Sequence, residues 1–251
     1  MDLGFSLFTG VAQNRRFMYK GKKILGLITA RGGSTGIPKK NIAFLAGKTL
    51  IWHTITAAQS SRFLTRTIVS TDDEEIAAVC REYGAEVPFM RPAEFARSDT
   101  PHISVVRHAL QWLADEAGEA YDYVMILQPT SPLRAADDID AAIIKAVDTT
   151  ADSVMSMVEL VDFDPAKIKK IDAEGVIQPL FQKEGRVSAL RQQGQKVYKR
   201  NGAIYLTKTE LIIKGDLFGG VSLPYVMPPE RSVDINEPSD LAYAEFLLRK
   251  L

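Results

Sequence analysis

Cations and glycines gather in one short stretch near the start of the chain, residues 31–41. The stretch reads RGGSTGIPKKN, so three glycines lie close to Arg31, Lys39 and Lys40. Glycine lets the backbone turn sharply and brings its N–H groups close to a ligand, while cations neutralise anionic oxygens. We therefore expect this stretch to bind a polyphosphate. The alternative is a tight glycine turn whose lysines face solvent.

This stretch matches neither of the standard phosphate-binding motifs. A P-loop has Gly-Lys-Ser/Thr after a glycine and four residues, and here Ile37 stands at that second glycine position counted from Gly32. The glycine pattern of dinucleotide-binding folds is also absent, which argues against a dehydrogenase. The apolar run Ile24–Ala30, directly before the stretch, is typical of a strand buried on both faces of a parallel sheet.

Composition argues against several classes of protein. The 31 basic and 31 acidic residues cancel, so no overall field attracts nucleic acid or an anionic membrane. No apolar run is long enough to span a membrane, and residues 1–22 place their charges after their apolar part, the reverse of a secretory signal. We expect a cytoplasmic protein in which residues 1–22 form an extension. The single cysteine, Cys80, excludes an internal disulfide framework.

Strand and helix patterns alternate after the basic stretch. Helical spacing follows at Leu50–Ala58, after Thr71-Asp72, after Thr100, at Ile139–Val147 and at Pro238–Lys250. Strands are predicted at Thr67–Ser70, Glu86–Met90, Tyr123–Leu127, Ser153–Val158, Arg200–Leu206 and Val221–Met227. This order predicts one α/β domain, residues 23–251, with a doubly wound, mostly parallel, Rossmann-like sheet.

The loop after the predicted strand Tyr123–Leu127 reads QPTSPLR. Its two prolines interrupt strand pairing and give a rigid loop. Polar groups at the carboxyl end of a central strand lie where open α/β sheets bind ligands. An equally good interpretation is a helix-capping turn, because Asp137 and Asp138 precede the next helical pattern.

Residues 161–198 have a different composition from the alternating units. Short β-like pieces such as Ala166–Ile171 are interrupted by glycines and prolines. Exposed strands need to be covered. We therefore predict that this segment is a small β-rich arm that leaves the domain and packs on a second subunit, giving a homodimer.

Six motifs occur in order along the chain: ARGGSTGIPKKN, STDDEEIA, YGAEVPFMRP, LQPTSPLR, RNGAIY and SVDINEPSDL. Together they resemble the acylneuraminate cytidylyltransferases, which make CMP-sialic acid and related CMP-nonulosonates. The resemblance covers roughly Lys23 to Leu251. It implies transfer of CMP from CTP to the anomeric hydroxyl of a nine-carbon 2-keto acid sugar. Pyrophosphate would be released and Mg²⁺ would be the cofactor.

The resemblance also implies roles for individual residues. Arg31, Lys40 and Asp234 would be catalytic, and Asp234 and Asn236 would bind Mg²⁺. The triphosphate would be held by Arg31, Gly32, Gly33, Ser34, Lys40 and Asn41. The cytosine and ribose would be bordered by Arg91, Asp99 and Thr100. The sugar would contact Gln128, Arg191, Gln192, Tyr198 and Asn201, with Arg191 and Gln192 reaching across from the partner subunit.

Two positions depart from the pattern of the family. Asn236 stands where a second aspartate is usual, so we expect coordination by one carboxylate or a helix-capping role before Pro238. Leu190 precedes Arg191 where the family often has a second arginine, which favours a different nonulosonate. Two alternatives stay open: a synthetase for the eight-carbon sugar KDO, disfavoured by QPTSP, and a non-catalytic nucleotide-binding module on the same fold.

Overall fold

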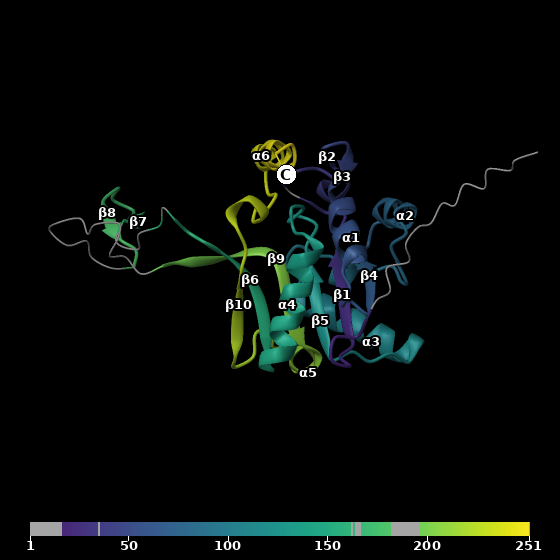
Figure 1. Cartoon of the computed structure of the whole chain (residues 1–251). Helices are drawn as coiled ribbons and strands as arrows, with labels where there is room; N and C mark the ends of the chain where they lie inside the picture. The colour runs from purple at the N-terminus through teal and green to yellow at the C-terminus, as the bar shows by residue number, and fades with distance from the viewer. Residues whose placement is uncertain (1–16, 35, 162, 164–166, 182–195, 251) are drawn as a thin grey trace, which may run out of the picture.

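The computed structural model describes residues 17–34, 36–161, 163, 167–181 and 196–250. Within them, six strands form one central sheet in the order β10-β6-β9-β5-β1-β4 (Figure 1). The strands are β1 (Ile24–Thr29), β4 (Arg66–Ser70), β5 (Tyr123–Leu127), β6 (Ser153–Glu159), β9 (Tyr198–Lys208) and β10 (Ser222–Val226). Neighbouring strands are parallel except where β9 pairs antiparallel with β5 and β6. The predicted mostly parallel sheet is confirmed.

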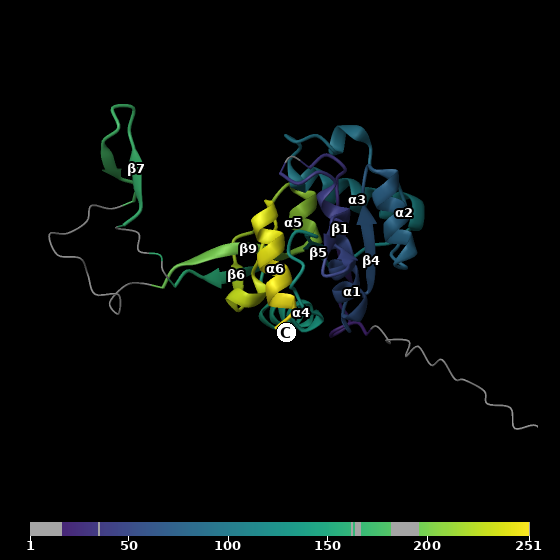
Figure 2. The same ribbon diagram turned by 90° about the horizontal axis from the view of Figure 1, so that it is seen from above.

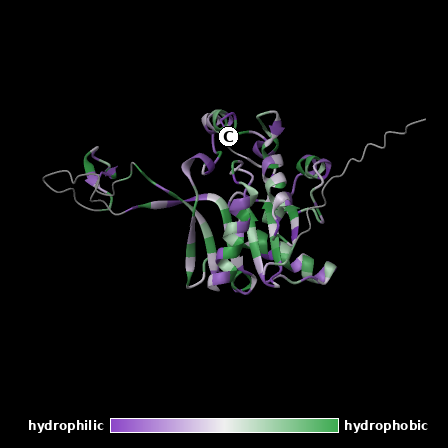
Figure 3. Cartoon of the chain, in the orientation of Figure 1, coloured by the Kyte–Doolittle hydropathy of each residue, from purple (hydrophilic) through white to green (hydrophobic). Residues whose placement is uncertain are grey.

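Side chains on alternate positions of the central strands point to opposite faces of the sheet, as the strand geometry requires. In β1, Ile24 and Ile28 pack on one face while Leu25 and Leu27 pack on the other. The first face is covered by α1 (Leu50–Ser60), α2 (Glu74–Glu82) and α4 (Ala136–Thr149). The second is covered by α3 (His102–Ala117) and α5 (Thr209–Ile213). Burial on both faces explains why the central strands are almost continuously apolar in Figure 3.

A third apolar cluster lies at the end of the sheet where the parallel strands terminate. It joins α6 (Pro238–Leu248) to the short hairpin of β2 (Phe44–Leu45) and β3 (Lys48–Thr49) through Leu45, Leu50 and Leu247. The described residues also form three 3-10 helices, η1 (Lys40–Ile42), η2 (Ala93–Phe95) and η4 (Pro229–Arg231). The last helix therefore docks against the segment that follows the glycine-rich stretch.

Two predicted elements differ from the structure. Residues 86–90 form no strand and contribute only isolated bridges, Glu86 to Ile68 and Met90 to Thr71, beside β4. Pro88 lacks a backbone N–H, which makes a regular ladder at this position unfavourable. The helix α2 is capped by Asp73, whose Oδ1 accepts from Glu75 N at 2.9 Å, and not by Thr71 or Asp72.

The arm is represented by the hairpin of β7 (Lys169–Ile171) and β8 (Ile177–Pro179), which lies away from the body of the molecule in both views (Figures 1 and 2). Its apolar side chains are open to solvent: Ile171 is 73%, Ile177 67% and Phe181 65% exposed. The predicted piece Ala166–Ile171 is confirmed over Lys169–Ile171 as β7. The hairpin, and the residues directly after it where Phe181 lies, therefore expose apolar surface.

The end of the predicted extension contacts the domain. The backbone N–H of Phe17 donates to Arg62 O at 2.8 Å, and the ring of Tyr19 packs on that of Phe63. Lys20 also forms an ion pair with Asp148 at 2.8 Å. Residues 1–16 lie outside the described residues, and the boundary at residue 22 remains a prediction.

Candidate active site

A cavity of about 380 Å³ opens where the carboxyl ends of β1, β4 and β5 meet. This is the edge at which open α/β sheets bind ligands. Its lining carries four cations, Arg31, Lys40, Arg91 and Arg97, against one carboxylate, Asp234, among the described residues. The other lining residues are Thr29, Ser34, Asn41, Phe95, Ser98, Thr100, His102, Val105, Gln128, Pro129, Thr130 and Asn236. Arg97 forms an ion pair with Asp99 at 2.9 Å, and the positive charge of the other three cations suits a polyphosphate.

The glycine-rich stretch is held by contacts from three directions. Gly32 N donates to Asp72 Oδ1 at 3.1 Å, and Asn41 Nδ2 donates to Arg31 O at 2.9 Å. Lys40 Nζ donates to Ile235 O at 2.8 Å, which connects the stretch to the loop before α6. Lys39, by contrast, forms an ion pair with Glu75 on α2. Two of the three predicted cations, Arg31 and Lys40, therefore line the cavity, and Lys39 does not.

Gly36 is needed because another backbone segment lies against it. A Cβ atom at this position would lie 2.4 Å from the carbonyl oxygen of Asn236, closer than any real contact. A carbonyl group held in a loop cannot move aside as the end of a flexible side chain can. Gly36 therefore allows the glycine-rich stretch to lie close to the Asn236 loop, a role separate from the expected ligand binding.

Arg91 reaches the cavity from the segment beside β4, where its backbone N–H donates to Thr71 O at 2.7 Å. The residue is 6% exposed and its Nε donates to Ser70 Oγ at 3.0 Å. Burial lowers the pKa of Arg91 to about 10, so it still carries its charge at neutral pH. Neutral oxygens hold its Nε and Nη2, so the attraction of this cation for an anionic ligand is not cancelled by a hydrogen-bonded carboxylate.

His102 also lines the cavity, which its sequence context did not predict. Its Nε2 lies 3.1 Å from Thr29 Oγ1 at the end of β1. Burial, with the charge of Arg91 as a smaller cause, lowers the pKa of His102 to about 4. The imidazole is therefore neutral at physiological pH.

This pKa predicts acid sensitivity of the folded state. An unfolded histidine takes up its proton near pH 6.5 whereas His102 does so near 4, so stability is lost as pH falls through that window. Between about pH 7 and pH 5 this group should remove about 2 kcal/mol of stability. Urea unfolding of the wild type and of His102→Gln at both pH values should show the smaller loss in the variant. Equal losses in the two proteins would contradict the assignment.

The loop after β5 proves to be both a cavity wall and a helix-capping turn. Gln128, Pro129 and Thr130 line the cavity. Asp138 Oδ2 accepts from Ala135 N at 2.9 Å at the start of α4. The helix-capping interpretation is therefore confirmed, while the other end of the loop lines the cavity and its ligand role stays a prediction.

Asp234 is the one carboxylate of the cavity lining, and its two oxygens have different surroundings. Oδ2 accepts from Asn236 Nδ2 at 3.0 Å. Oδ1 is buried, and no donor among the described residues reaches it. Asn236 does not cap α6, because the carboxylate of Asp240 accepts from Asn236 N and Glu237 N instead. The capping role expected for Asn236 is wrong, and its side chain orients Asp234.

Five other predicted site residues, all of them described, lie outside this cavity lining. Gly32 has its N–H bonded to Asp72, and Gly33 and Asp99 are not among the lining residues. Asn201 is 3% exposed, and its Nδ2 donates to Ser232 Oγ at 2.9 Å. Tyr198 lies at the start of β9, on the arm side. Arg191 and Gln192 fall outside the described residues, so the sugar contacts predicted for these four side chains remain predictions.

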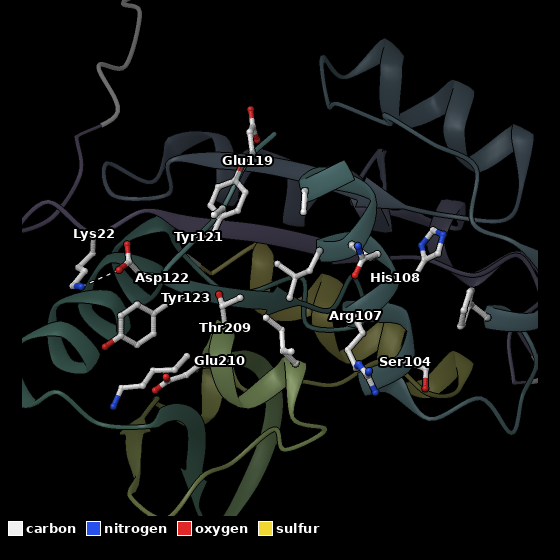
Figure 4. Close-up of a pocket in the computed structure, with 17 residues that line it drawn as sticks. Lys22, Ser104, Arg107, His108, Glu119, Tyr121, Asp122, Tyr123, Thr209 and Glu210 are labelled. Atoms are coloured by element: carbon white, nitrogen blue, oxygen red, sulfur yellow. Dashed lines mark hydrogen bonds and ion pairs between the residues drawn. The ribbon is translucent and has the colours of Figure 1, made fainter. Parts of the chain in front are cut away.

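A second cavity, of about 920 Å³, lies between α3 and α5 beside the start of β5 (Figure 4). Of the predicted nucleotide, sugar and metal residues that the structure describes, none lines it. Two of its cations are neutralised by aspartates, since Lys22 pairs with Asp122 and Lys208 with Asp152, each at 2.9 Å. The smaller cavity is therefore the better candidate for an anionic substrate, although Phe95 borders both.

Within the described residues, three or more metal-binding side chains nowhere cluster tightly enough to hold an ion by themselves. Among the same residues no helix is long and apolar enough to cross a membrane. A metal at Asp234 would therefore need further oxygen ligands, and a bound phosphate is one source of them.

The chain matches the family model for cytidylyltransferase over residues 25–226. The chain belongs to this family. It is 35% identical over 229 residues to a CMP-N,N'-diacetyllegionaminic acid synthase of Legionella pneumophila, covering 90% of this chain and 96% of that one. It is 29% identical to a pseudaminic acid cytidylyltransferase of Campylobacter jejuni, covering 90% and 97% of the two chains.

This cytidylyltransferase is also 31% identical to an N-acylneuraminate cytidylyltransferase of Escherichia coli, where the match covers 91% of this chain and 52% of the longer relative. Its fold is shared with a solved CMP:2-keto-3-deoxy-manno-octonic acid synthetase complexed with CTP, at a TM-score of 0.67. The two structures are 14% identical, and 91% of this chain is covered. At that identity the likeness supports the fold alone.

Proposed function

We propose that this cytidylyltransferase transfers CMP from CTP to the anomeric hydroxyl of a nonulosonic acid and releases pyrophosphate. The observation that carries the proposal is the meeting of four separate motifs at one cavity. Arg31 and Lys40, Arg91, Gln128 and Asp234 come from segments far apart in the chain and line the same space. The relatives named for legionaminic, pseudaminic and sialic acid chemistry support a nonulosonate as the acceptor.

The cations of the cavity account for the phosphoryl chemistry. Transfer of a nucleotidyl group requires alignment of the reactants and neutralisation of the charge that develops on the leaving pyrophosphate. Arg31 and Lys40, at the glycine-rich stretch, would hold the triphosphate. Arg91 and the neutral His102 would border the nucleoside, and Gln128 would face the sugar.

Asp234 fits a role as a ligand of Mg²⁺. Its Oδ1 is a buried oxygen with no donor from the described residues, and a hard cation prefers such carboxylate oxygens. When bound, the metal would supply Lewis-acid charge to the phosphates. The Asn236 amide holds the other oxygen, Oδ2, and so fixes the plane of the carboxylate.

The metal role predicts a specific defect in Asp234→Ala. We expect activity at saturating Mg²⁺ to fall by roughly two orders of magnitude, as when a charge-stabilising group is removed from a transition state. Mn²⁺ affinity, followed by electron paramagnetic resonance with CTP present, should fall with it. Asp240→Asn, a change at the nearby helix start, should leave metal affinity unaltered. A wild-type-like rate in Asp234→Ala would remove the metal role.

The reaction itself is tested by incubating the protein with CTP, Mg²⁺ and separate sialic, legionaminic and pseudaminic acids. Mass spectrometry should detect one or more CMP-sugars, and pyrophosphate release should require both CTP and the sugar. KDO serves as the eight-carbon comparison. Absence of product with all three nonulosonates would reject the proposal. Product with KDO alone would favour the KDO synthetase. We propose a cytoplasmic site of action, because CTP must be available.

We also propose that the arm pairs two copies of the chain and brings Arg191 and Gln192 towards the partner's site. The support is the exposed apolar surface of the β7–β8 hairpin, where Ile171 is 73% and Ile177 67% exposed. Ile177→Asp should shift the protein from dimer to monomer in size-exclusion chromatography with light scattering. Val221→Asp, at an exposed apolar residue of the body, is the control and should remain dimeric. A monomeric wild type would refute the pairing.

A further inference from the structure

Arg134 is buried directly behind the cavity loop, with 3% of its surface exposed. Its Nε donates to Ala203 O and its Nη2 to Gln128 O, both at 2.8 Å, and its Nη1 lies 3.3 Å from Thr54 Oγ1. Each acceptor is neutral. Burial lowers the pKa of Arg134 to about 9, and the charge of Asp138 opposes this only in part. The guanidinium therefore joins three elements, the end of β5, β9 and α1.

Gln128 and β9 meet at Gly202, where a backbone of positive φ and a close side chain both favour glycine. Gly202 has a positive φ of 80°, and a Cβ there would lie 3.2 Å from Gln128 Oε1. The side chain of Gln128 thus lies against the bare Cα of Gly202, one residue before the carbonyl that Arg134 holds. A second contact joins the loop after β5 to β9, since Ser131 Oγ donates to Asn201 O at 3.3 Å.

We propose that Arg134 is a positioning residue that holds the Gln128 amide against Gly202 and thereby sets the affinity of the enzyme for its sugar acceptor. The inference rests on the proposed function, in which Gln128 faces the sugar. It does not extend to CTP, because Arg31, Lys40 and Arg91 bond to acceptors other than those of Arg134. We therefore expect a change at Arg134 to alter the affinity for the sugar and not the affinity for CTP.

The shape of the arginine side chain matters more than its charge. A guanidinium presents donors in a fixed plane and can bond two carbonyls on different strands at once, which a lysine ammonium cannot do with the same geometry. Arg134→Lys keeps the positive charge but loses these donors in a fixed plane. Gly202→Ala adds a Cβ 3.2 Å from Gln128 Oε1 and 3.3 Å from Ser131 Oγ, so it crowds Gln128 without removing a contact of Arg134. Thr54→Val removes one acceptor with little change of volume.

The test compares these three variants with the wild type, using the nonulosonate that the wild type accepts. Arg134→Lys and Gly202→Ala should each raise KM for the sugar by roughly ten-fold, with Kd for CTP by calorimetry within about two-fold of wild type. Thr54→Val should shift KM for the sugar in the same direction by a smaller factor. The control is Ser156→Ala, which removes a buried contact to Ile204 N at 2.7 Å, two residues from Gly202. It should lower the thermal midpoint and leave both substrate constants unchanged.

Equal changes in Kd for CTP and KM for sugar, or no change in either, would overturn the inference while leaving the reaction established. If Arg134→Lys does not fold, Gly202→Ala and Thr54→Val decide the question by the same criterion. A wild type that turns over no nonulosonate overturns the proposed function, and this inference with it.

Discussion

Arg31→Ala should lower kcat/KM for CTP by roughly 30- to 900-fold, a loss of about 2–4 kcal/mol of transition-state stabilisation. Arg31 lines the cavity at the end of β1, beside Lys40. Its charge would neutralise the leaving pyrophosphate where water is partly excluded, so removal costs more than loss of a solvent-exposed cation. Steady-state kinetics with the wild-type sugar would measure the effect.

Lys39→Ala is the matched control for that prediction. Lys39 belongs to the same stretch and carries the same charge, yet its ammonium pairs with Glu75 on α2 and does not line the cavity. We expect kcat/KM for Lys39→Ala within about three-fold of the wild type, since exposed ion pairs contribute little. Similar losses in the two variants would mean that overall positive charge, and not the placement of Arg31, drives catalysis.

The largest effect on stability is expected from Asp138→Ala. Asp138 is 1% exposed, and its carboxylate accepts from Arg231 Nε at 3.0 Å and from Tyr225 Oη and Ala135 N at 2.9 Å each. Alanine would leave these donors without their acceptor. We expect a loss of about 2–4 kcal/mol, below the top of the range for breaking a buried ion pair because Arg231 is partly solvated.

Thermal or urea unfolding would measure this loss, and Tm should fall by roughly 5–15 °C for a domain of this size. Asp137→Ala is the control on the same turn of α4. Asp137 is exposed, so its removal should change stability by less than about 0.5 kcal/mol. If Asp138→Ala unfolds with the same midpoint as Asp137→Ala, the ion pair with Arg231 does not contribute to stability.

The sequence was informative where residue type alone decides structure. The strand at Tyr123–Leu127 was predicted with its observed bounds, because five consecutive apolar residues followed by Gln-Pro leave few alternatives. The site cations Arg31 and Lys40 were found because glycines and cations in one short stretch suit anions. Pro88 is the sequence signal against a strand at residues 86–90, because proline has no backbone N–H to donate to a neighbouring strand.

Features that depend on tertiary packing could not be predicted. That Lys39 pairs with Glu75 follows from where α2 docks, and nothing in the local sequence states it. His102 reaches the cavity because α3 begins beside the end of β1, where its Nε2 lies 3.1 Å from Thr29 Oγ1. The fit of Gly36 against Asn236 likewise joins segments that only the fold brings together.

The contact between Lys40 Nζ and Ile235 O spans 195 positions of the chain, and it has a consequence for biosynthesis. Domains emerge from the ribosome amino end first, at roughly 5–20 residues per second. The glycine-rich stretch is therefore made before Asp234 and α6, which follow about 195 positions later. Ligand binding stabilises only a fold that already contains the site. CTP can thus stabilise the fold only after Asp234 and α6 have emerged and the site is complete.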